Sequence, residues 1–488
     1  MTRILLIEPP TPENKFQVMR ILASIGSLKA NVSYPPYDLM IMGGLLNKHN
    51  IEHKIVDGLA MKMQWKDVKD LIKKENPEAV VFTTTVATMD NDVTVAKIAK
   101  QVNKDIVTIP INIAMESSRV NYLDRYPFVD FVPYQDFEFP ILDLIKNNYK
   151  PDKVRGIYFR RGKKIIKNSG GQCFNLDELG TPDQAGITPY LDYYKDFIAR
   201  KHPFTIVCGT RGCTNQCHHC MSRYLNPLRF RSVESVIKEL KLVRALGISE
   251  LKWWDGELPA DFRWGKKLFE AMIKEKLDLS WSCNARADCL NRETLKLMKK
   301  AGCHTINLGA DSNSQTILNN MNKNETVKDV EQKAKMVKEM GFSLFTYCTL
   351  GHKGETKETI ENTIDWIINK IDPDYTTFSI VVPVYGTVFY YYLKKNGYLH
   401  EQDVFDENWD PSKPPKFDYI GRMEKEGLPD LTSDEMYQLI MKGWRKFYLR
   451  PKFLLKRFST PHNFMFSVRN FPHFVNMYLL EPLKRKND

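Results

Sequence analysis

Apolar and polar positions along residues 1–150 form short blocks that alternate between two periodicities. Four apolar runs predict buried strands, at residues 3–7, 52–57, 79–83 and 106–110. Helical periodicity fills the intervals between them, at residues 39–46, 65–74 and 93–102. A further short run, residues 131–133, predicts a fifth strand. Alternation at this pitch indicates a doubly wound parallel sheet, which we expect to form an N-terminal domain over residues 1–150.

The same alternation resumes over residues 201–400. Six apolar runs predict parallel strands, at residues 204–208, 250–254, 279–283, 304–308, 343–350 and 375–382. Helical patterns, such as residues 292–301 and 326–340, separate them. Six parallel strands with crossover helices make a partial (β/α)6 barrel, whose functional loops follow the carboxyl ends of the strands. Residues 151–200, which are turn-rich and include a hairpin at residues 156–166, are expected to be a connector.

The pattern changes again over residues 401–488. Residues 403–416 are polar and carry proline, as expected of a loop or lid, and residues 432–448 predict a helix that begins at Thr432 or Ser433. Aromatic side chains then alternate with Lys and Arg, and more aromatic residues follow, at Phe464, Phe466, Phe471 and Phe474. The fold class is therefore α/β, with two α/β domains and an α-helical basic C-terminal region.

Composition places the chain inside a reducing compartment. The 488 residues suffice for two or three domains, and no apolar run reaches the roughly 20 residues of a spanning helix. The sequence after Met1 enters a strand pattern directly, so we expect no secretory signal and a cytoplasmic location. Nine cysteines, an odd number, agree with this. Outside the motif described next they lie mostly in or beside apolar strands and predict no second metal centre.

The net charge of +12 is concentrated near the end of the chain. Residues 441–488 carry eleven Lys or Arg and two Asp or Glu, while the remainder is nearly balanced. Basic and aromatic residues together can bind single-stranded nucleic acid or an anionic membrane surface. They can also form a helix packed on the barrel with a solvated basic face. The tail resembles that of enzymes acting on lipids and tetrapyrroles, which favours peripheral membrane contact over nucleic acid.

Three cysteines with C-x3-C-x2-C spacing follow the first strand of the predicted barrel, at Cys213, Cys217 and Cys220. Thiolates are soft ligands that bind iron–sulfur clusters. Three thiolates on a four-iron cluster leave one iron open, which indicates catalysis. The alternative is a zinc site that adds His218 or His219, in a protein without enzymatic activity that binds nucleic acid or membrane.

This motif resembles the radical S-adenosylmethionine (radical SAM) superfamily. The resemblance implies a 4Fe–4S cluster on the three cysteines, whose open iron binds the amino and carboxylate groups of S-adenosylmethionine. An electron from an external donor then cleaves the sulfonium, and the 5′-deoxyadenosyl radical abstracts hydrogen from an unactivated carbon. His219 stands where the family usually has an aromatic residue before the third cysteine, and it joins the predicted cofactor-binding residues.

Further cofactor contacts are assigned by the same resemblance, at the ends of later strands. The methionine amino group is expected at Asp255, Gly256 and Glu257. The ribose and carboxylate of S-adenosylmethionine are expected at Ser282, Asn284 and Arg286. Asp311 ends the fourth strand in place of the usual, longer Glu.

The N-terminal domain resembles, in order and position, the cobalamin-binding domain that precedes many radical SAM enzymes. Ligands of doubly wound sheets lie beyond the carboxyl ends of the strands, so the ligand-facing candidates are Pro9, Asp57, Thr83 and Thr84. The chain lacks the Asp-x-His-x-x-Gly motif and is poor in glycine at residues 111–115 and 134–138, where relatives have glycine-rich turns. The alternative is a degenerate domain kept as a scaffold or substrate wall.

These features predict a radical SAM enzyme that modifies a hydrophobic, lipid-, isoprenoid- or tetrapyrrole-like substrate. With cobalamin bound, the expected reaction is methylation of an unactivated carbon. Without it, the alternatives are radical carbon–carbon coupling, cyclisation or oxidation. Two features favour a hydrophobic substrate: the basic tail, and the aromatic-rich last barrel strand that is predicted over residues 378–392. Modification of nucleic acid is a less favoured alternative.

Overall fold

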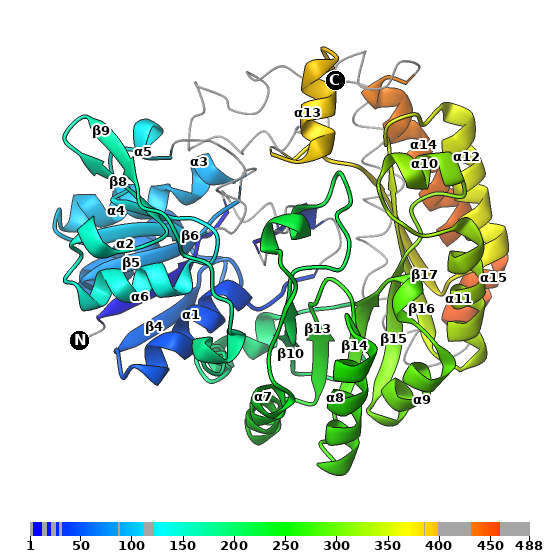
Figure 1. Ribbon diagram of the computed structural model, residues 1–488, viewed down its shortest axis with the longest axis horizontal. Helices are drawn as coiled ribbons and strands as arrows, with labels where there is room; N and C mark the ends of the chain where they lie inside the picture. The colour runs from blue at the N-terminus through cyan, green and yellow to red at the C-terminus, as the bar shows by residue number, and fades with distance from the viewer. Residues whose placement is uncertain are drawn as a thin grey trace.

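A computed structural model describes residues 3–11, 17–20, 26–28, 32–85, 88–111, 122–384, 386–398 and 431–458. Two parallel sheets dominate it, one near each end of the long axis (Figure 1). None of the helices in these ranges combines the length and apolar character needed to cross a bilayer.

The N-terminal sheet has four parallel strands in the order β4-β1-β5-β6. They are β1 (Ile4–Glu8), β4 (His53–Asp57), β5 (Ala79–Thr83) and β6 (Val107–Ile111). Ile4 and Leu6 pack toward α1 (Tyr37–Lys48) and α6 (Glu138–Lys146), and Leu5 and Ile7 pack toward α2 (Trp65–Glu75) and α4 (Thr94–Val102). Helices therefore cover both faces, which confirms the doubly wound sheet.

One local expectation in this region was wrong. The predicted fifth strand is present as β7 (Phe131–Pro133), but it pairs antiparallel with β8 (Ile157–Arg161), which forms a hairpin with β9 (Lys164–Lys167), so it belongs to a separate three-stranded sheet. The helix expected over residues 93–102 is confirmed as α4, and a short helix, α3 (Met89–Asp92), precedes it.

The second sheet confirms the partial barrel. Its six strands are all parallel and follow chain order: β10 (Phe204–Val207), β13 (Glu250–Trp253), β14 (Ser280–Ala285), β15 (Cys303–Gly309), β16 (Ser343–Leu350) and β17 (Tyr375–Ile380). The helices between them are α7 (Val233–Ala245), α8 (Phe262–Lys274), α9 (Arg292–Lys300), α11 (Val327–Glu339) and α12 (Lys357–Trp366). Side-chain oxygens cap their first turns, at Ser232, Asp261, Asn291, Thr326 and Thr356.

Side chains alternate across the barrel strands, which fixes the residues that face the interior. Trp253 on β13 and Trp281 on β14 pack into the outer core with the helices. Their neighbours Lys252, Ser282 and Asn284 therefore point to the inner face.

The first barrel strand is shared between two cores. Val207 packs in the core of the barrel, whereas Phe204, Ile206 and Cys208 pack in the core that contains α1 and the inner face of the N-terminal sheet. Residues of the connector, among them Leu176 and Tyr194, belong to the same N-terminal core. The N-terminal domain thus closes the β10 side of the partial barrel (Figure 1).

The aromatic segment at residues 378–392 is a strand only in part. β17 ends at Ile380, and a turn that includes Pro383 leads to α13 (Val388–Lys395), whose first turn is capped by the Thr387 hydroxyl. Proline cannot continue a strand ladder and Thr is a strong N-cap, so local turn chemistry overrides the aromatic composition.

The predicted C-terminal helix is present as α14 (Ser433–Tyr448), and α15 (Pro451–Phe458) follows it. Lys442 pairs with Glu361 at 2.8 Å, and Lys446 pairs with Asp365, both on α12. In the described part of the tail, much of the basic charge therefore meets acidic side chains of the barrel. The predicted loop at residues 403–416 and the aromatic residues Phe464, Phe466, Phe471 and Phe474 lie outside the described residues.

Helix α14 also covers the free edge of β17. The Trp444 Nε1–H donates to the Phe378 carbonyl at 2.9 Å, and the Tyr448 hydroxyl donates to the Thr376 carbonyl at 2.7 Å. Trp444 and Tyr448 are four residues apart, which is about 6 Å along a helix, and Thr376 and Phe378 are two residues apart, which is about 6.6 Å along a strand. The spacing of the two donors therefore matches that of the two acceptors. Edge strands expose unpaired backbone groups that invite aggregation, and α14 satisfies two of them here.

Removing both donors is expected to weaken this attachment. For the Trp444→Phe/Tyr448→Phe chain we expect a loss of roughly 1–3 kcal/mol in the free energy of unfolding, because two buried carbonyls lose a partner while the rings remain. Urea unfolding followed by circular dichroism measures it. Tyr193→Phe, at a phenol that is 48% exposed, is the control and should change little. Equal stability of the double variant and the parent would contradict the edge-capping role.

Candidate functional site

The three cysteines lie on a loop between two short paired strands, β11 (Thr210–Arg211) and β12 (Arg229–Phe230). Gly212 starts the loop with a φ of +105°, and a Cβ there would come within 2.8 Å of the Leu228 Cα, so only glycine fits this close approach. Arg211 pairs with Asp136 and Glu138, both at 2.5 Å, and Arg229 also pairs with Asp136. Buried ion pairs therefore anchor both ends of the loop to the N-terminal domain.

Each of the three thiols is half-buried and accepts a hydrogen bond from an amide. The Asn215 backbone N–H donates to Cys213 Sγ at 3.4 Å, and its side-chain Nδ2 donates to Cys217 Sγ at 3.5 Å. The Ser222 N–H donates to Cys220 Sγ at 3.4 Å. Such amide–sulfur bonds stabilise thiolates and set the potential of iron–sulfur clusters, so the donor set fits a cluster.

The cysteine thiols bear on both the cluster and the zinc hypotheses. Within the ranges that the structure describes, no three His, Cys, Asp or Glu side chains converge closely enough to hold one metal ion. A cuboidal cluster binds each thiolate at a different iron, so its ligands stand farther apart than those of a single zinc ion. Burial raises the pKa of Cys217 to about 12, and it also raises the pKa of Cys213, with help from the Glu257 carboxylate. Bound iron deprotonates such thiols outright.

The loop rests on the end of β13. The buried Glu257 carboxylate accepts hydrogen bonds from the Thr214 N–H at 2.7 Å and from Cys213 Sγ at 2.8 Å. A Cβ at Gly256 would lie 3.7 Å from the Cys213 Cβ, so its backbone touches the loop. Asp255 is directed elsewhere, because its carboxylate accepts from the Gly209 N–H at 3.1 Å. Burial raises the pKa of Asp255 to about 6.

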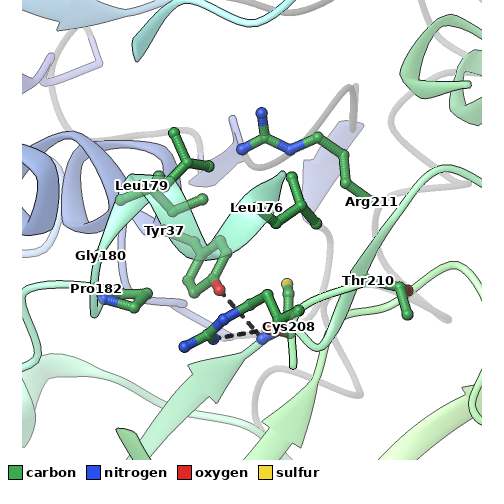
Figure 2. A pocket seen from close by; sticks show the side chains of 10 residues that line it. Tyr37, Leu176, Leu179, Gly180, Pro182, Cys208, Thr210 and Arg211 are labelled. Carbon is green, nitrogen blue, oxygen red and sulfur yellow. Dashed lines mark hydrogen bonds between the residues drawn. The ribbon is translucent and has the colours of Figure 1, made fainter. Parts of the chain in front are cut away.

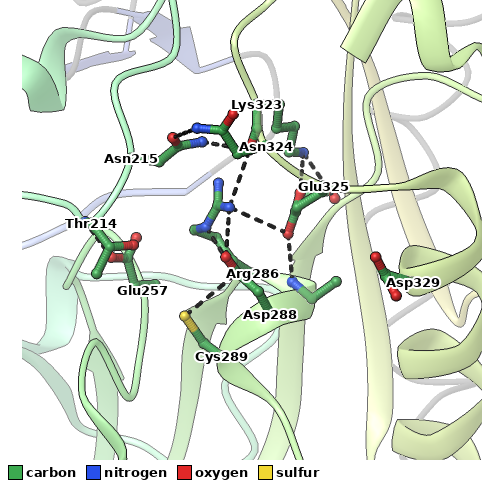
Figure 3. Close-up of polar contacts among 12 residues, drawn as sticks. Thr214, Asn215, Glu257, Arg286, Asp288, Cys289, Lys323, Asn324, Glu325 and Asp329 are labelled. Atoms are coloured by element: carbon green, nitrogen blue, oxygen red, sulfur yellow. Dashed lines mark hydrogen bonds and ion pairs between the residues drawn. The ribbon is translucent and has the colours of Figure 1, made fainter. Parts of the chain in front are cut away.

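On the opposite side of the loop, Arg286 takes part in an ionic network with two residues that the sequence reasoning missed, Lys323 and Glu325 (Figure 3). Asp311 joins this network through Lys323. Arg286 donates to both oxygens of Asp288, at 3.0 and 2.9 Å, and to the Lys323 carbonyl at 3.1 Å. The Lys323 ammonium pairs with Asp311. Burial alone would raise the pKa of Asp311, but Lys323 holds it below its usual value.

Residues 322–325 reach the cysteine loop from the β15 side. The Asn215 Nδ2 donates to the Lys323 carbonyl at 2.5 Å, and the Asn324 Nδ2 donates to the Asn215 side chain at 2.8 Å. Asn322 and Asn324 have φ values of 56° and 53°, which asparagine tolerates better than most residues. The Asn-Lys-Asn pattern marks a turn in the sequence, but nothing local indicates which loop it meets.

The remaining barrel candidates lie on the same inner face. Asn284 donates to the Asp255 carbonyl at 3.1 Å and accepts from Asn307 at 3.2 Å, and the buried Ser282 lies two residues earlier on β14. His219 is half-buried, and its ring meets that of His352 at 4.7 Å between centroids. Burial lowers the pKa of His219 to about 4, so at neutral pH the ring is uncharged and packs as an aromatic residue does.

The candidates in the N-terminal domain come together at a different edge, where the chain's own groups engage them. Arg20 donates to Glu8 at 2.7 Å, to Asp92 at 2.6 Å and to the Pro9 carbonyl at 3.1 Å. The Thr83 hydroxyl donates to Glu8. The network lies between β1 and β5, where the order of the sheet reverses.

Two further candidates at this edge are also engaged. Asp57 accepts from the Tyr194 hydroxyl at 3.0 Å, and burial raises its pKa to about 7. The Thr84 and Tyr122 hydroxyls lie 3.2 Å apart. Asn91 Oδ1 is buried without a hydrogen-bond partner in the described residues, so it offers an acceptor to the carboxamides of a corrin. Residues 12–16, 21–25 and 112–121, which include much of the glycine-poor stretch after β6, lie outside the described residues.

A small cavity of about 30 Å³ lies between α1, the connector and the end of β10 (Figure 2). Tyr37, Leu176, Cys208 and Arg211 are among its lining residues. The Tyr37 hydroxyl accepts the Cys208 N–H at 3.2 Å, and Arg211 is held by its carboxylate partners. The cavity therefore belongs to the packing between the domains and not to the cysteine loop.

Comparison with known proteins agrees with this site. The profile of the Radical SAM superfamily matches residues 207–367. An uncharacterized methyltransferase of Pyrococcus horikoshii is 29% identical over 95% of the chain and 96% of its own length. The anaerobic magnesium-protoporphyrin IX monomethyl ester cyclase of Rubrivivax gelatinosus is 24% identical, over 88% of the chain and 76% of its length.

A solved structure has the same fold over nearly the whole chain. It is the cobalamin-dependent S-adenosylmethionine radical enzyme OxsB with aqua-cobalamin and S-adenosylmethionine bound. It superposes with a TM-score of 0.69 at 14% identity, covering 98% of this chain and 73% of that one.

Proposed function

We propose that this chain is a cobalamin-dependent methyltransferase, which acts on an unactivated carbon of a hydrophobic substrate. The premise is that the chain is a radical SAM enzyme with a cobalamin-binding-like N-terminal domain. The observation that carries the proposal is the cysteine loop. Its three thiols each accept a hydrogen bond from an amide, and it lies between Glu257 and the network of Arg286 and Asp311. The methyltransferase name of the Pyrococcus relative supports the choice of reaction.

The chain's own residues have distinct tasks in this proposal. Cys213, Cys217 and Cys220 hold the cluster, which supplies the electron that cleaves S-adenosylmethionine once an external donor has reduced it. Glu257 fixes the loop through Thr214 and presents a buried carboxylate toward the amino group of the methionine moiety. Asp288 orients the Arg286 guanidinium through two hydrogen bonds, and this guanidinium is proposed to bind the methionine carboxylate. Asn91 would accept a corrin carboxamide in the N-terminal domain.

A hydrophobic substrate is supported by the aromatic lining of the barrel. Phe345 and Tyr347 on β16 contact each other at 4.8 Å between centroids, and Phe197 of the connector meets both Phe345 and Tyr375. Tyr347 is 37% exposed although it points to the inner face, so solvent reaches this part of the interior. Lipid-, isoprenoid- and tetrapyrrole-like molecules all suit such a lining. Contact with a membrane surface through residues 459–488 stays a prediction.

The alternative reaction is a radical ring closure or coupling without cobalamin. The buried network of Arg20, Glu8 and Asp92 favours it, because these side chains fill the reversal point of the N-terminal sheet. The name of the Rubrivivax relative, a cyclase, points the same way.

Anaerobic reconstitution with iron, sulfide and cobalamin distinguishes the two reactions. For the methyltransferase we expect about four iron and about one cobalt per chain after desalting, because the domain retains one corrin. With S-adenosylmethionine carrying a deuterated methyl group, the product should gain that label. Asn91→Leu should lower the retained cobalt without changing the iron. Full iron with no cobalt, and a product of unchanged methyl content, would instead support ring closure.

A further inference from the structure

A buried lysine lies on the inner face of the barrel, far from the cysteine loop. Lys252 on β13 has a side chain that is 2% exposed, and its nearest carboxylate oxygen, on Asp196 of the connector, is 3.8 Å from its Nζ. That distance allows an ion pair but no hydrogen bond. The Lys252 ammonium carries three donors, and Asp196 lies too far away to accept a hydrogen bond from any of them.

Asp196 is already held by another donor. Its Oδ1 accepts the Ile198 N–H at 2.9 Å. A buried ammonium without hydrogen bonds is costly, so the barrel interior at Lys252 calls for a further acceptor. The position of Asp196 explains why the cation remains charged: burial lowers the pKa of Lys252, but Tyr347 and Asp196 nearby outweigh it and raise the pKa overall.

The surroundings of Lys252 are aromatic. Its Nζ lies 6.0 Å from the centre of the Trp254 ring, which packs against Tyr34 at 5.0 Å. Tyr347, on the inner face of β16, contributes with Asp196 to the raised pKa of Lys252, and it is 37% exposed. A ligand that enters along Tyr347 therefore meets ring surfaces first and a single cation at the end.

We propose that Lys252 and Tyr347 form an anion subsite on the floor of the barrel, which binds a carboxylate carried by a hydrophobic, ring-bearing substrate. This inference rests on the proposed function, because it names the class of substrate for the same barrel. Asp255 lies three positions after Lys252, just beyond the end of β13, which corresponds to about 10 Å of extended chain. A substrate held by its carboxylate at Lys252 thus extends its far end toward the cysteine loop.

The test compares two probes of equal shape, naphthalene-2-carboxylate and naphthalene-2-carboxamide, by isothermal titration calorimetry on the full-length reconstituted chain. We expect the parent to bind the carboxylate at least about tenfold more tightly than the amide, because only the carboxylate brings a negative charge to pair with the buried ammonium. Lys252→Met should abolish this preference. Lys241→Met, at an exposed lysine paired with Glu275 at 2.7 Å on the outside of the barrel, should retain it.

A second variant keeps the test decisive if Lys252→Met fails to fold. Asp196→Asn removes the competing anion, so it should strengthen carboxylate binding several-fold and leave amide binding unchanged. Equal binding of the two probes by the parent, or carboxylate binding that Asp196→Asn weakens or leaves unaltered, overturns the subsite. Neither assay measures methyl transfer or cobalamin binding. A chain that binds the carboxylate through Lys252 but transfers no methyl group refutes only the proposed function.

Discussion

Cys217→Ala is expected to abolish the cleavage of S-adenosylmethionine and to reduce the iron retained after anaerobic reconstitution far below the roughly four atoms per chain of the parent. Cys217 is one of only three thiols in the loop, and Asn215 connects it to the Lys323 carbonyl on the far side. With two thiolates left, the cluster loses an iron ligand that no neighbouring side chain replaces within the described residues. Iron and sulfide analysis, with chromatographic detection of 5′-deoxyadenosine, measures both effects.

Cys173→Ala is the matched control for this experiment. Its thiol is buried in the connector, where burial holds its pKa at about 12, and it lies outside the cysteine loop. We expect unchanged iron content and unchanged cleavage. A parent chain that binds one zinc and no iron, or a Cys217→Ala chain that retains the full cluster, would overturn the assignment of the loop.

The largest effect on stability is expected from Arg20→Met. The Arg20 side chain is fully buried and pairs with two carboxylates that are themselves buried, those of Glu8 and Asp92. Burial raises the pKa of both carboxyls even with Arg20 beside them, which shows how strongly they depend on their partner. Removing one member of a buried ionic group leaves an uncompensated charge and costs roughly 3–5 kcal/mol.

The effect can be measured by urea unfolding at neutral pH. Arg3→Met is the control, because Arg3 pairs with Glu78 at 2.8 Å on the surface, where such pairs contribute at most about 1 kcal/mol. Similar losses in the two variants would show that the Arg20 network is not the buried, dry cluster that the structure describes.

The sequence predicted the chemistry of the site better than its surroundings. The cysteine spacing, the strand that precedes it and the acidic strand end at Glu257 are local patterns, so they could be recognised without a structure. Lys323 and Lys252 could not, because their roles depend on contacts with Asp311 twelve positions earlier and with Asp196 in another domain segment. Hydrophobic periodicity places a residue on a face, but it does not say which distant loop meets that face.

The N-terminal domain shows the same limit. Its strands were found from apolar runs, yet Arg20 stands in a stretch without clear periodicity, and its partners lie 12 and 72 residues away. Candidates such as Asp57 were correctly placed at strand ends, but their role toward a ligand stays a prediction, since Tyr194 from the connector already occupies that carboxylate. The helix α13 was missed because aromatic residues favour strands on average, whereas the Pro383 and Thr387 turn decides locally.

The division of β10 between two cores bears on how the chain acquires its structure. Val207 on one face and Phe204 and Ile206 on the other belong to different hydrophobic clusters, so neither cluster is complete until this strand is in place. We therefore expect the two sheets to unfold together, because each loses part of its core when β10 leaves. Recombining this barrel with a foreign N-terminal domain would expose an apolar face, and gene fusions in this architecture must preserve the partner that covers it.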